Sequence, residues 1–162
     1  MLEATPRRLS LLYQLYLASQ ASRRFMKLAL AGEGISGEEY ALFSYLYANG
    51  PRTLSQAARD LGMAVTSLAT VMEPLIAGGE VERRPHPRDR RARLLALTDA
   101  GRQRLLSAMP AFSAAYRALL DELATGGADP EGIYAALDQL RAGLERSVEQ
   151  LADASEVMTR QA

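Results

Sequence analysis

Residues 80–98 read EVERRPHPRDRRARLLALT and place six arginines within the eleven positions from Arg83 to Arg93. Asp89 is the one acid among them, so the local charge is six minus one, or +5, in a chain whose 19 basic and 19 acidic side chains cancel. Like charges held this close repel one another unless a polyanion or a partner compensates them. The apolar residues on either side of the arginines alternate loosely, which predicts two short antiparallel strands joined by a long basic hairpin.

Two short helices are predicted just before this hairpin. Thr53 and Gln56 have the spacing of a capping box at the start of LSQAARDLG, a short helix that Gly62 ends. The next helix, in VTSLATVMEPLIAGG, has an apolar side and a polar side at helical spacing: Leu68, Met72, Leu75 and Ile76 on the first, and Thr66, Ser67 and Thr70 on the second. Two helices linked by a glycine turn and followed by a two-stranded hairpin make a winged helix-turn-helix, here residues 53–98.

The chemistry of this winged unit suits duplex DNA. A helix with a small polar face fits the major groove, while a basic hairpin reaches the phosphates or the narrower groove beside it. Pro85 and Pro87 around His86 are expected to stiffen the hairpin, so that less conformational entropy is lost on docking. The plainer interpretations are a solvated turn for the hairpin and an ordinary exposed face for the polar side of the helix. The arginines that need a polyanion are Arg83, Arg84, Arg88, Arg90, Arg91 and Arg93.

Further helices are predicted on both sides of the winged unit. Pro110 is expected to bend the fifth of them. The fold class is therefore mainly α with a small β-hairpin wing. Capping and first-turn residues mark the helix starts: Thr5 and Pro6 for the first helix, Ser36 with Glu39 for the second, Thr98 and Asp99 for the fifth, and Asp129 and Pro130 for the sixth.

Composition narrows the classes of function. A chain of 162 residues with 48% apolar and 23% charged residues has the size and composition of one globular domain. It has no cysteine and a single histidine, His86, with no cluster of carboxylates near it, so we expect no metal and no cofactor. No candidate nucleophile is paired with a base and no glycine-rich phosphate loop is present, so an enzyme is not expected. The N-terminus lacks the continuous apolar core of a signal peptide or a membrane span, which predicts a cytoplasmic protein.

These motifs together resemble the MarR family of bacterial transcription regulators. The similarity spans nearly the whole chain and is carried by LSQAARDLG, by the wing VERRPHPRDRRARLLALTDAGR and by the long flanking helices. Asp89 and Arg91 stand at the family's Asp-x-Arg positions in the wing. LTDAG, at residues 97–101, matches the Leu-Thr-x-x-Gly start of the family's fifth helix.

The resemblance implies a homodimer bound to double-stranded DNA. Residues 1–162 would form a single domain, with a winged helix-turn-helix DNA-binding lobe at 36–98 and a helical dimerisation region at 5–32 and 99–158. The first, fifth and sixth helices would pack across a two-fold axis. Each lobe would then place one helix in the major groove of a pseudo-palindromic operator.

The same resemblance assigns roles to single residues by position. Asp89 would orient an arginine through a charge-assisted hydrogen bond, although it also fits a simple turn residue. Contacts in the grooves would come from two places: Thr66, Ser67 and Thr70 on the helix, and Arg90 or Arg91 at the wing tip.

Three residues depart from the family's pattern. Ala64 stands where family members usually have a serine cap, and it offers no side-chain oxygen to the first free backbone N–H groups. Thr70 replaces a common arginine, and Pro74 replaces a frequent arginine or lysine. Pro74 is also expected to bend the helix or to remove one of its hydrogen bonds. We therefore expect the wing to supply most of the affinity and the helix a modest specificity.

Aromatic residues in the first two helices suggest a ligand site. The resembled family often binds small, frequently phenolic, anions between its dimerisation helices and its winged lobe. The alternative interpretation is that these side chains are hydrophobic core. The candidates for ligand binding are Tyr13, Tyr16, Arg23, Arg24, Tyr40, Phe43 and Tyr47.

The function expected from the sequence is that of a dimeric, sequence-specific DNA-binding transcriptional regulator. The resemblance favours a repressor that a small phenolic effector releases from DNA. One alternative keeps the DNA binding but makes the protein an activator or a constitutive regulator. The other is a dimeric ligand-binding or protein-interaction module with the same fold and weak or lost specific DNA binding, as Ala64, Thr70 and Pro74 allow.

Overall fold

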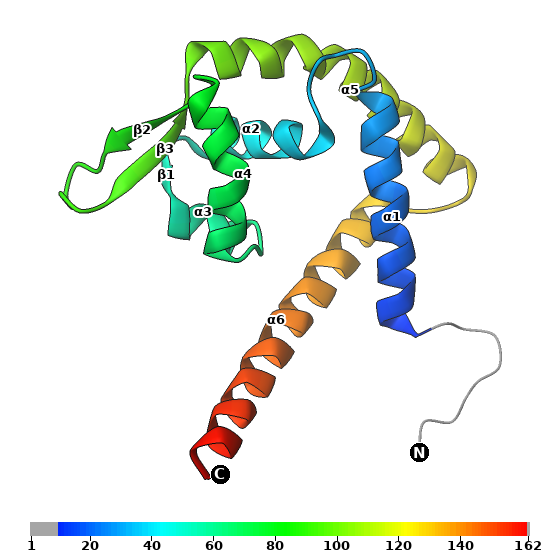
Figure 1. Cartoon of the computed structure of the whole chain (residues 1–162). Helices are drawn as coiled ribbons and strands as arrows, with labels where there is room; N and C mark the ends of the chain where they lie inside the picture. Colours follow the sequence, from blue (N-terminus) through cyan, green and yellow to red (C-terminus); the bar gives the residue numbers. More distant parts are fainter. Residues whose placement is uncertain (1–9, 162) are drawn as a thin grey trace. The chain divides into compact units, whose positions relative to one another are not determined.

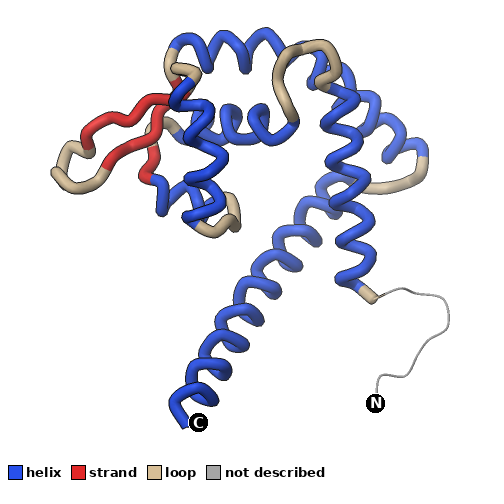
Figure 2. Tube along the Cα trace, viewed as in Figure 1, coloured by secondary structure: helices blue, strands red, loops and turns tan. Residues whose placement is uncertain are grey.

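The computed structural model describes residues 10–161, with side chains as far as Ala154, and is mainly helical with one small sheet (Figures 1 and 2). It divides into two compact units, the first ending at Ala115 and the second beginning at Tyr116. The elements in chain order are α1 Leu11–Ala29, α2 Gly37–Asn49, β1 Arg52–Thr53, α3 Leu54–Asp60, α4 Val65–Ala77, β2 Val81–Pro85, β3 Arg93–Leu97, α5 Asp99–Thr125 and α6 Pro130–Gln161.

Among the described residues, helix α1 begins at Leu11. Its N-cap is Ser10, whose hydroxyl accepts a hydrogen bond from the backbone N–H of Tyr13 at 3.3 Å. Thr5 and Pro6, the predicted start, lie outside the described residues. The second predicted start is confirmed, because Ser36 and Glu39 form a complete capping box at the beginning of α2.

The predicted helix-turn-helix is confirmed in α3 and α4. Thr53 and Gln56 form the second capping box, at the start of α3. Gly62 follows α3 with φ of 63°, a left-handed conformation that glycine adopts without strain. Ala64 is the N-cap of α4 and makes no side-chain cap hydrogen bond, as its methyl group dictates. Pro74 lies inside α4 without ending it, and the N–H of Gly78 still donates to the Pro74 carbonyl at 2.8 Å.

The sheet has one strand more than the sequence predicts. Strands β2 and β3 form the expected antiparallel hairpin, with Val81 opposite Leu97 and Pro85 opposite Arg93. The two-residue strand β1 pairs with the other edge of β3, giving the order β1-β3-β2. In Figures 1 and 2 the loop between β2 and β3 projects beyond the helices of the first unit.

One hydrophobic core joins α2, α3, α4, the sheet and the start of α5. Its largest fully buried side chains are Phe43, Leu68, Met72, Leu105 and Val81. A polar contact beside this core ties α2 to α3, since the hydroxyl of Tyr45 donates to the Asp60 carboxylate at 2.6 Å. Burial and this hydrogen bond to Asp60 raise the pKa of Tyr45 to about 12. Apolar packing, with polar contacts at the surface, therefore holds the elements of the lobe together.

The start of α5 is fastened to the turn between α4 and β2. Thr98 is the predicted N-cap and is confirmed: its Oγ1 accepts from the N–H of Gly101 at 3.2 Å and lies 2.8 Å from the carbonyl oxygen of Gly79. The N–H of Thr98 donates to the carbonyl of Glu80 at 3.0 Å. A Cβ at Gly101 would lie only 2.2 Å from that same Glu80 oxygen, so no larger residue fits. The Leu-Thr-x-x-Gly pattern thus has a physical reason in the close approach of two backbones.

Arg104 extends this junction to α2. Its Nε donates to the carbonyl of Gly34 at 3.0 Å, and its Nη1 donates to the Glu80 carboxylate at 2.5 Å. Its Nη2 lies 3.3 Å from the carboxylate of Glu39, the capping-box residue of α2. One guanidinium group therefore links the loop after α1, the start of α2 and the turn before β2.

The second unit is a helical hairpin made by the end of α5 and by α6. Gly127, with φ of 73°, ends the turn after α5. The Asp129 carboxylate accepts from the N–H groups of Glu131 and Gly132 at 3.2 and 3.0 Å, which confirms the predicted start of α6. Helix α5 continues through Pro110 to Thr125. Among the described side chains of α6, the large apolar ones that are exposed are Ile133, Tyr134, Leu137, Val148 and Leu151.

No single helix among residues 10–161 is long and apolar enough to cross a membrane. Only α3 and α4 taken together, with a bend of 114° between them, pass that test by length and composition.

Replacing Gly101 with alanine is expected to destabilise the protein by at least about 2 kcal/mol, because the methyl group meets backbone that cannot move aside. Thermal melting followed by circular dichroism measures the effect. Gly143→Ala in α6 is the matched control, since nothing lies within 4 Å of a methyl group there and alanine favours a helix by about 1 kcal/mol. Equal melting temperatures for Gly101→Ala and the wild type would contradict the packing described.

Stability is expected to fall in acid through Glu39. Burial raises the pKa of Glu39, but hydrogen bonds from Ser36 and the charge of Arg104 outweigh it and bring the pKa below the ordinary 4.5. Because the pKa of Glu39 is lower in the folded than in the unfolded state, its ionised carboxylate stabilises the fold. This stabilisation is complete above the unfolded-state pKa and is lost as the pH falls through the folded-state pKa.

The measurement is urea unfolding of the wild type and Glu39→Gln, which keeps the capping box but does not titrate. The wild type should be the more stable at about pH 7, and this difference should shrink as the pH falls toward about 3. Glu149→Gln, at an exposed position of α6, controls for the loss of one charge. A difference that grows in acid would refute the assignment.

Candidate nucleic-acid interface

Helix α4 presents a small polar face. Thr66, Ser67 and Thr70 are all exposed, while Leu68, Met72 and Leu75 on its other side are buried in the core. The hydroxyl of Thr70 donates to the carbonyl of Thr66 at 3.1 Å, so these two side chains are held along one line of the helix. The predicted division of α4 into a core side and a polar side is confirmed.

The tip of the hairpin is closed by its own side chains. Nδ1 of His86 accepts hydrogen bonds from the N–H groups of Arg88 and Asp89 at 3.2 and 3.0 Å. The Asp89 carboxylate accepts from the backbone N–H of Arg91 at 2.9 Å, and the Asp89 carbonyl accepts from the N–H of Ala92 at 3.2 Å. The expectation that Asp89 orients an arginine side chain was wrong for this structure, because the carboxylate binds backbone and acts as a turn residue.

The six arginines of the hairpin fall into two groups. Arg83 donates to the Glu73 carboxylate on α4, and Arg84 donates to Glu82 at 2.7 Å from Nε, so the charges at the base of the wing are partly compensated. Toward the tip, Arg93 donates from Nη1 to the carbonyls of Arg90 and Ala92 at 3.1 and 3.2 Å. Within the part of the chain whose side chains are described, ion pairs are absent from Arg88, Arg90, Arg91 and Arg93.

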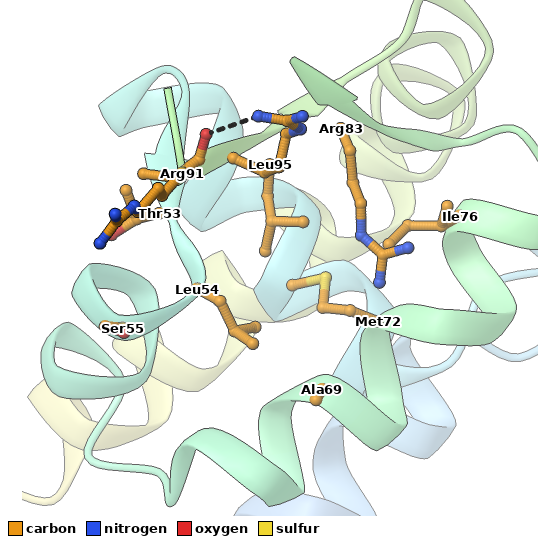
Figure 3. Close-up of a pocket in the computed structure, with 11 residues that line it drawn as sticks. Thr53, Leu54, Ser55, Ala69, Met72, Ile76, Arg83, Arg91 and Leu95 are labelled. Carbon is orange, nitrogen blue, oxygen red and sulfur yellow. Dashed lines mark hydrogen bonds between the residues drawn. The ribbon is translucent and has the colours of Figure 1, made fainter. Parts of the chain in front are cut away.

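A cleft of about 280 Å³ separates the wing from the two helices and is lined by the arginines of both groups. Figure 3 shows Arg83 reaching from β2 to α4 beside Ile76 and Met72, with Arg91 at the other side of the cleft. Arg93 completes the basic lining, and Thr53 and Ser55 of the α3 start lie opposite. The polar face of α4 and the basic wing thus lie in one lobe, next to each other.

The predicted ligand residues do not form one site. Tyr40 is buried against Phe112 with ring centroids 4.6 Å apart, and Phe43 is fully buried. Tyr47 lies under the guanidinium of Arg102, 5.2 Å from its carbon. Tyr13 and Tyr16 lie side by side on α1 and are about half exposed. Tyr40 and Phe43 are therefore part of the hydrophobic core, which was the alternative to a ligand site.

A hollow between α1 and α2 contains one of the predicted ligand residues. It has a volume of about 790 Å³ and is lined by Arg23, Lys27, Ser36 and Glu38 among others. A neighbouring hollow of about 530 Å³ along α1 is lined by Arg23, Arg24 and Lys27. In the described part of the chain, the five predicted aromatic residues line neither of them.

Residues 33–92, which include the helix-turn-helix and most of the wing, match the model of the MarR family. Over these residues the chain is similar to proteins of the MarR family. No curated protein matches the sequence. The match ends at Ala92, so β3 and the long helices after it are compared through solved structures instead.

Solved structures of MarR-like regulators share the fold along most of the chain. A probable transcriptional regulator from Pseudomonas aeruginosa is 25% identical over 81% of this chain and 96% of its own, with a TM-score of 0.70. The transcriptional repressor CouR, solved with a 23-mer DNA duplex, is 23% identical over 90% of this chain and 99% of its own, with a TM-score of 0.68. BpsR of Bordetella bronchiseptica, whose DNA binding is regulated by 6-hydroxynicotinic acid, is 20% identical over 82% and 91%, with a TM-score of 0.66.

The match to the MarR family model bears on the class of protein. The match over residues 33–92 and the fold shared with the probable regulator from Pseudomonas aeruginosa support a transcriptional regulator with a DNA-binding winged-helix fold rather than an enzyme. The described residues contain no group of three or more histidine, aspartate or glutamate side chains that could hold a metal ion.

Sequence reasoning missed two polar contacts of this lobe. The first is Arg104, which looks like any exposed arginine of an amphipathic helix until α2 and Glu80 are brought beside it. The second is the pair of Arg83 and Glu73. A signal for the second was present, because Glu73 follows Thr70 by three residues and so lies on the polar side of α4.

Proposed function

We propose that this protein is a homodimeric, sequence-specific DNA-binding repressor that a small aromatic anion releases from its operator. The main support for a DNA interface is that one lobe contains both the exposed polar face of α4 and the basic tip of the hairpin. DNA offers the polyanion that unpaired guanidinium groups at such a tip need. Contacts are assigned to Thr66, Ser67, Thr70, Arg83, Arg84, Arg88, Asp89, Arg90, Arg91 and Arg93.

The two parts of the lobe have different tasks in this proposal. Helix α4 is the recognition helix and enters the major groove, with Thr66, Ser67 and Thr70 facing the base edges. The wing tip reaches the minor groove through Arg90 or Arg91, and Asp89 acts indirectly by holding the turn in shape. Likeness to the repressor CouR, whose structure contains a DNA duplex, supports the proposal.

Replacing Arg90 and Arg91 together with alanine is expected to weaken DNA binding strongly, because two guanidinium groups leave the interface. The measurement is a fluorescence anisotropy titration against duplexes from the DNA flanking the gene, at several salt concentrations. The slope of log affinity against log salt should become shallower by about two, because each phosphate that is no longer neutralised reduces it by about 0.9.

The control for this change removes two positive charges elsewhere. Arg141 and Arg146 on α6 are exposed, and replacing both with alanine should leave the affinity and the salt slope nearly unchanged. Unchanged binding by the Arg90 and Arg91 variant would reject the assignment of the wing. If random duplex competed as well as flanking DNA, the alternative of a fold with lost sequence reading would hold.

A second copy of the chain is the proposed partner of the exposed apolar side chains. On α6, Leu137, Val148 and Leu151 are between 48% and 71% exposed. Apolar side chains on a helix that is already packed against a partner are far less exposed. On α1 the exposed apolar residues are Leu11, Leu12, Tyr13, Tyr16, Leu17 and Leu28. The proposed dimerisation region therefore comprises the first helix together with residues 99–158, and 36–98 is the DNA-binding lobe.

Sedimentation is expected to show twice the chain mass of 17.6 kDa. Leu137→Glu combined with Val148→Glu places charges on the proposed interface and should yield a monomer at the same concentration. Asp138→Asn combined with Glu149→Gln, on the same helix, should leave the dimer intact. A wild-type protein that sediments at 17.6 kDa would contradict the proposal.

The effector site is proposed in the hollow between α1 and α2. Its volume of about 790 Å³ suits a small organic ligand, and Arg23 and Lys27 offer positive charge to a carboxylate. Regulation of BpsR by 6-hydroxynicotinic acid supports an aromatic acid as the effector class. In the DNA titration, such an acid should release the wild type, and Arg23→Ala should need far more of it.

A further inference from the structure

Glu73 is an acid on the side of α4 that the proposed function turns toward DNA. Thr66, Thr70 and Glu73 follow one another at spacings of four and three, which places them along one face of the helix. Its side chain is 59% exposed, so the hydrophobic core does not fix its position. A carboxylate on a surface that approaches phosphates is unfavourable unless a positive charge neutralises it or it accepts a hydrogen bond from the DNA.

The Arg83 guanidinium supplies the neutralisation. Arg83 of β2 donates to the Glu73 carboxylate on α4, and Figure 3 shows Arg83 extending toward α4 beside Met72 and Ile76. An ion pair as exposed as this one, at 49% and 59%, contributes little to folding stability, so stability does not account for the acid. The contact involves Oε1, and a carboxylate has about four acceptor positions, which leaves it able to accept further hydrogen bonds.

We infer that Glu73 is a specificity-determining residue that accepts a hydrogen bond from the exocyclic amino group of a cytosine in the major groove, with Arg83 as its positioning residue; this inference rests on the proposed DNA-binding function. A carboxylate only accepts hydrogen bonds. The N4 amino group of cytosine is the donor that aspartate and glutamate read in the major groove. Guanine and thymine offer no amino group there, so the carboxylate discriminates against them.

The pairing with Arg83 gives the carboxylate a defined direction. A free glutamate side chain on a helix surface samples several rotamers, and ordering it on DNA would weaken the contact. The guanidinium holds the carboxylate beside the wing before DNA arrives, and it lowers the repulsion from nearby phosphates.

Selection from a pool of duplexes with a randomised central segment tests the inference. The wild type should enrich a palindromic motif with a cytosine at one position of each half-site. Glu73→Gln should shift that position toward adenine, because an amide pairs with the N6 and N7 of adenine, and should lose about tenfold in preference for cytosine. Glu73→Ala should enrich the same motif with that position no longer selected.

Glu82→Gln is the matched control. It removes the same charge and breaks the other ion pair of the wing, with Arg84, but Glu82 is on β2 and not on the recognition helix. Its motif should equal that of the wild type. Identical motifs for the wild type, Glu73→Gln and Glu73→Ala would overturn the inference while leaving the proposed function standing. A wild type that enriches no motif would overturn sequence-specific binding itself, and the inference with it.

Discussion

The close approach of α5 to the carbonyl of Glu80 is the constraint on which the rest of the lobe depends. Glu80 lies between the end of α4 and the start of β2, so its position sets the angle between the helix and the wing. Its backbone carbonyl accepts from Thr98 and contacts Gly101, and its carboxylate receives Arg104. Backbone and side chain of one residue thus fasten three elements, and the wing has little freedom to pivot at its base.

Rigidity at the base is matched by a closed turn at the tip. His86 and Asp89 satisfy backbone N–H groups that an open loop would leave to water. Charge compensation decreases from the base of the hairpin to its tip. Arg83 and Arg84 form ion pairs, whereas the arginines nearer the tip face solvent. The basic residues that reach farthest from the lobe are therefore those whose charge is least compensated within it.

Local patterns predicted the parts of the fold that local physics determines. The capping boxes at Ser36 and Thr53, the turn at Gly62 and the hairpin all depend on residues a few positions apart, and all were confirmed. Strand β1 was missed because two residues carry no periodicity, and it exists only through pairing with β3. Arg104 was missed for the same reason, since its partners are as many as 70 positions away.

The candidate site was less predictable from the sequence than the fold. Charge density alone selected the six arginines of the hairpin as candidates, but it could not separate Arg83, which binds Glu73, from the arginines nearer the tip. The role of Asp89 was misjudged because a sequence does not tell whether a carboxylate meets a side chain or the backbone two residues on. Aromatic spacing suggested a ligand site for Tyr40 and Phe43, although burial in the core accounts for both.

Exact cancellation of charge over the whole chain gives the exposed arginines an additional consequence. A molecule with net charge zero feels no long-range pull toward DNA as a point charge would. The hairpin nevertheless carries a concentrated positive charge, and its local field acts within a Debye length of about 8 Å in physiological salt. Under the proposed function, this field would draw the hairpin toward the phosphates of a duplex before any groove is read.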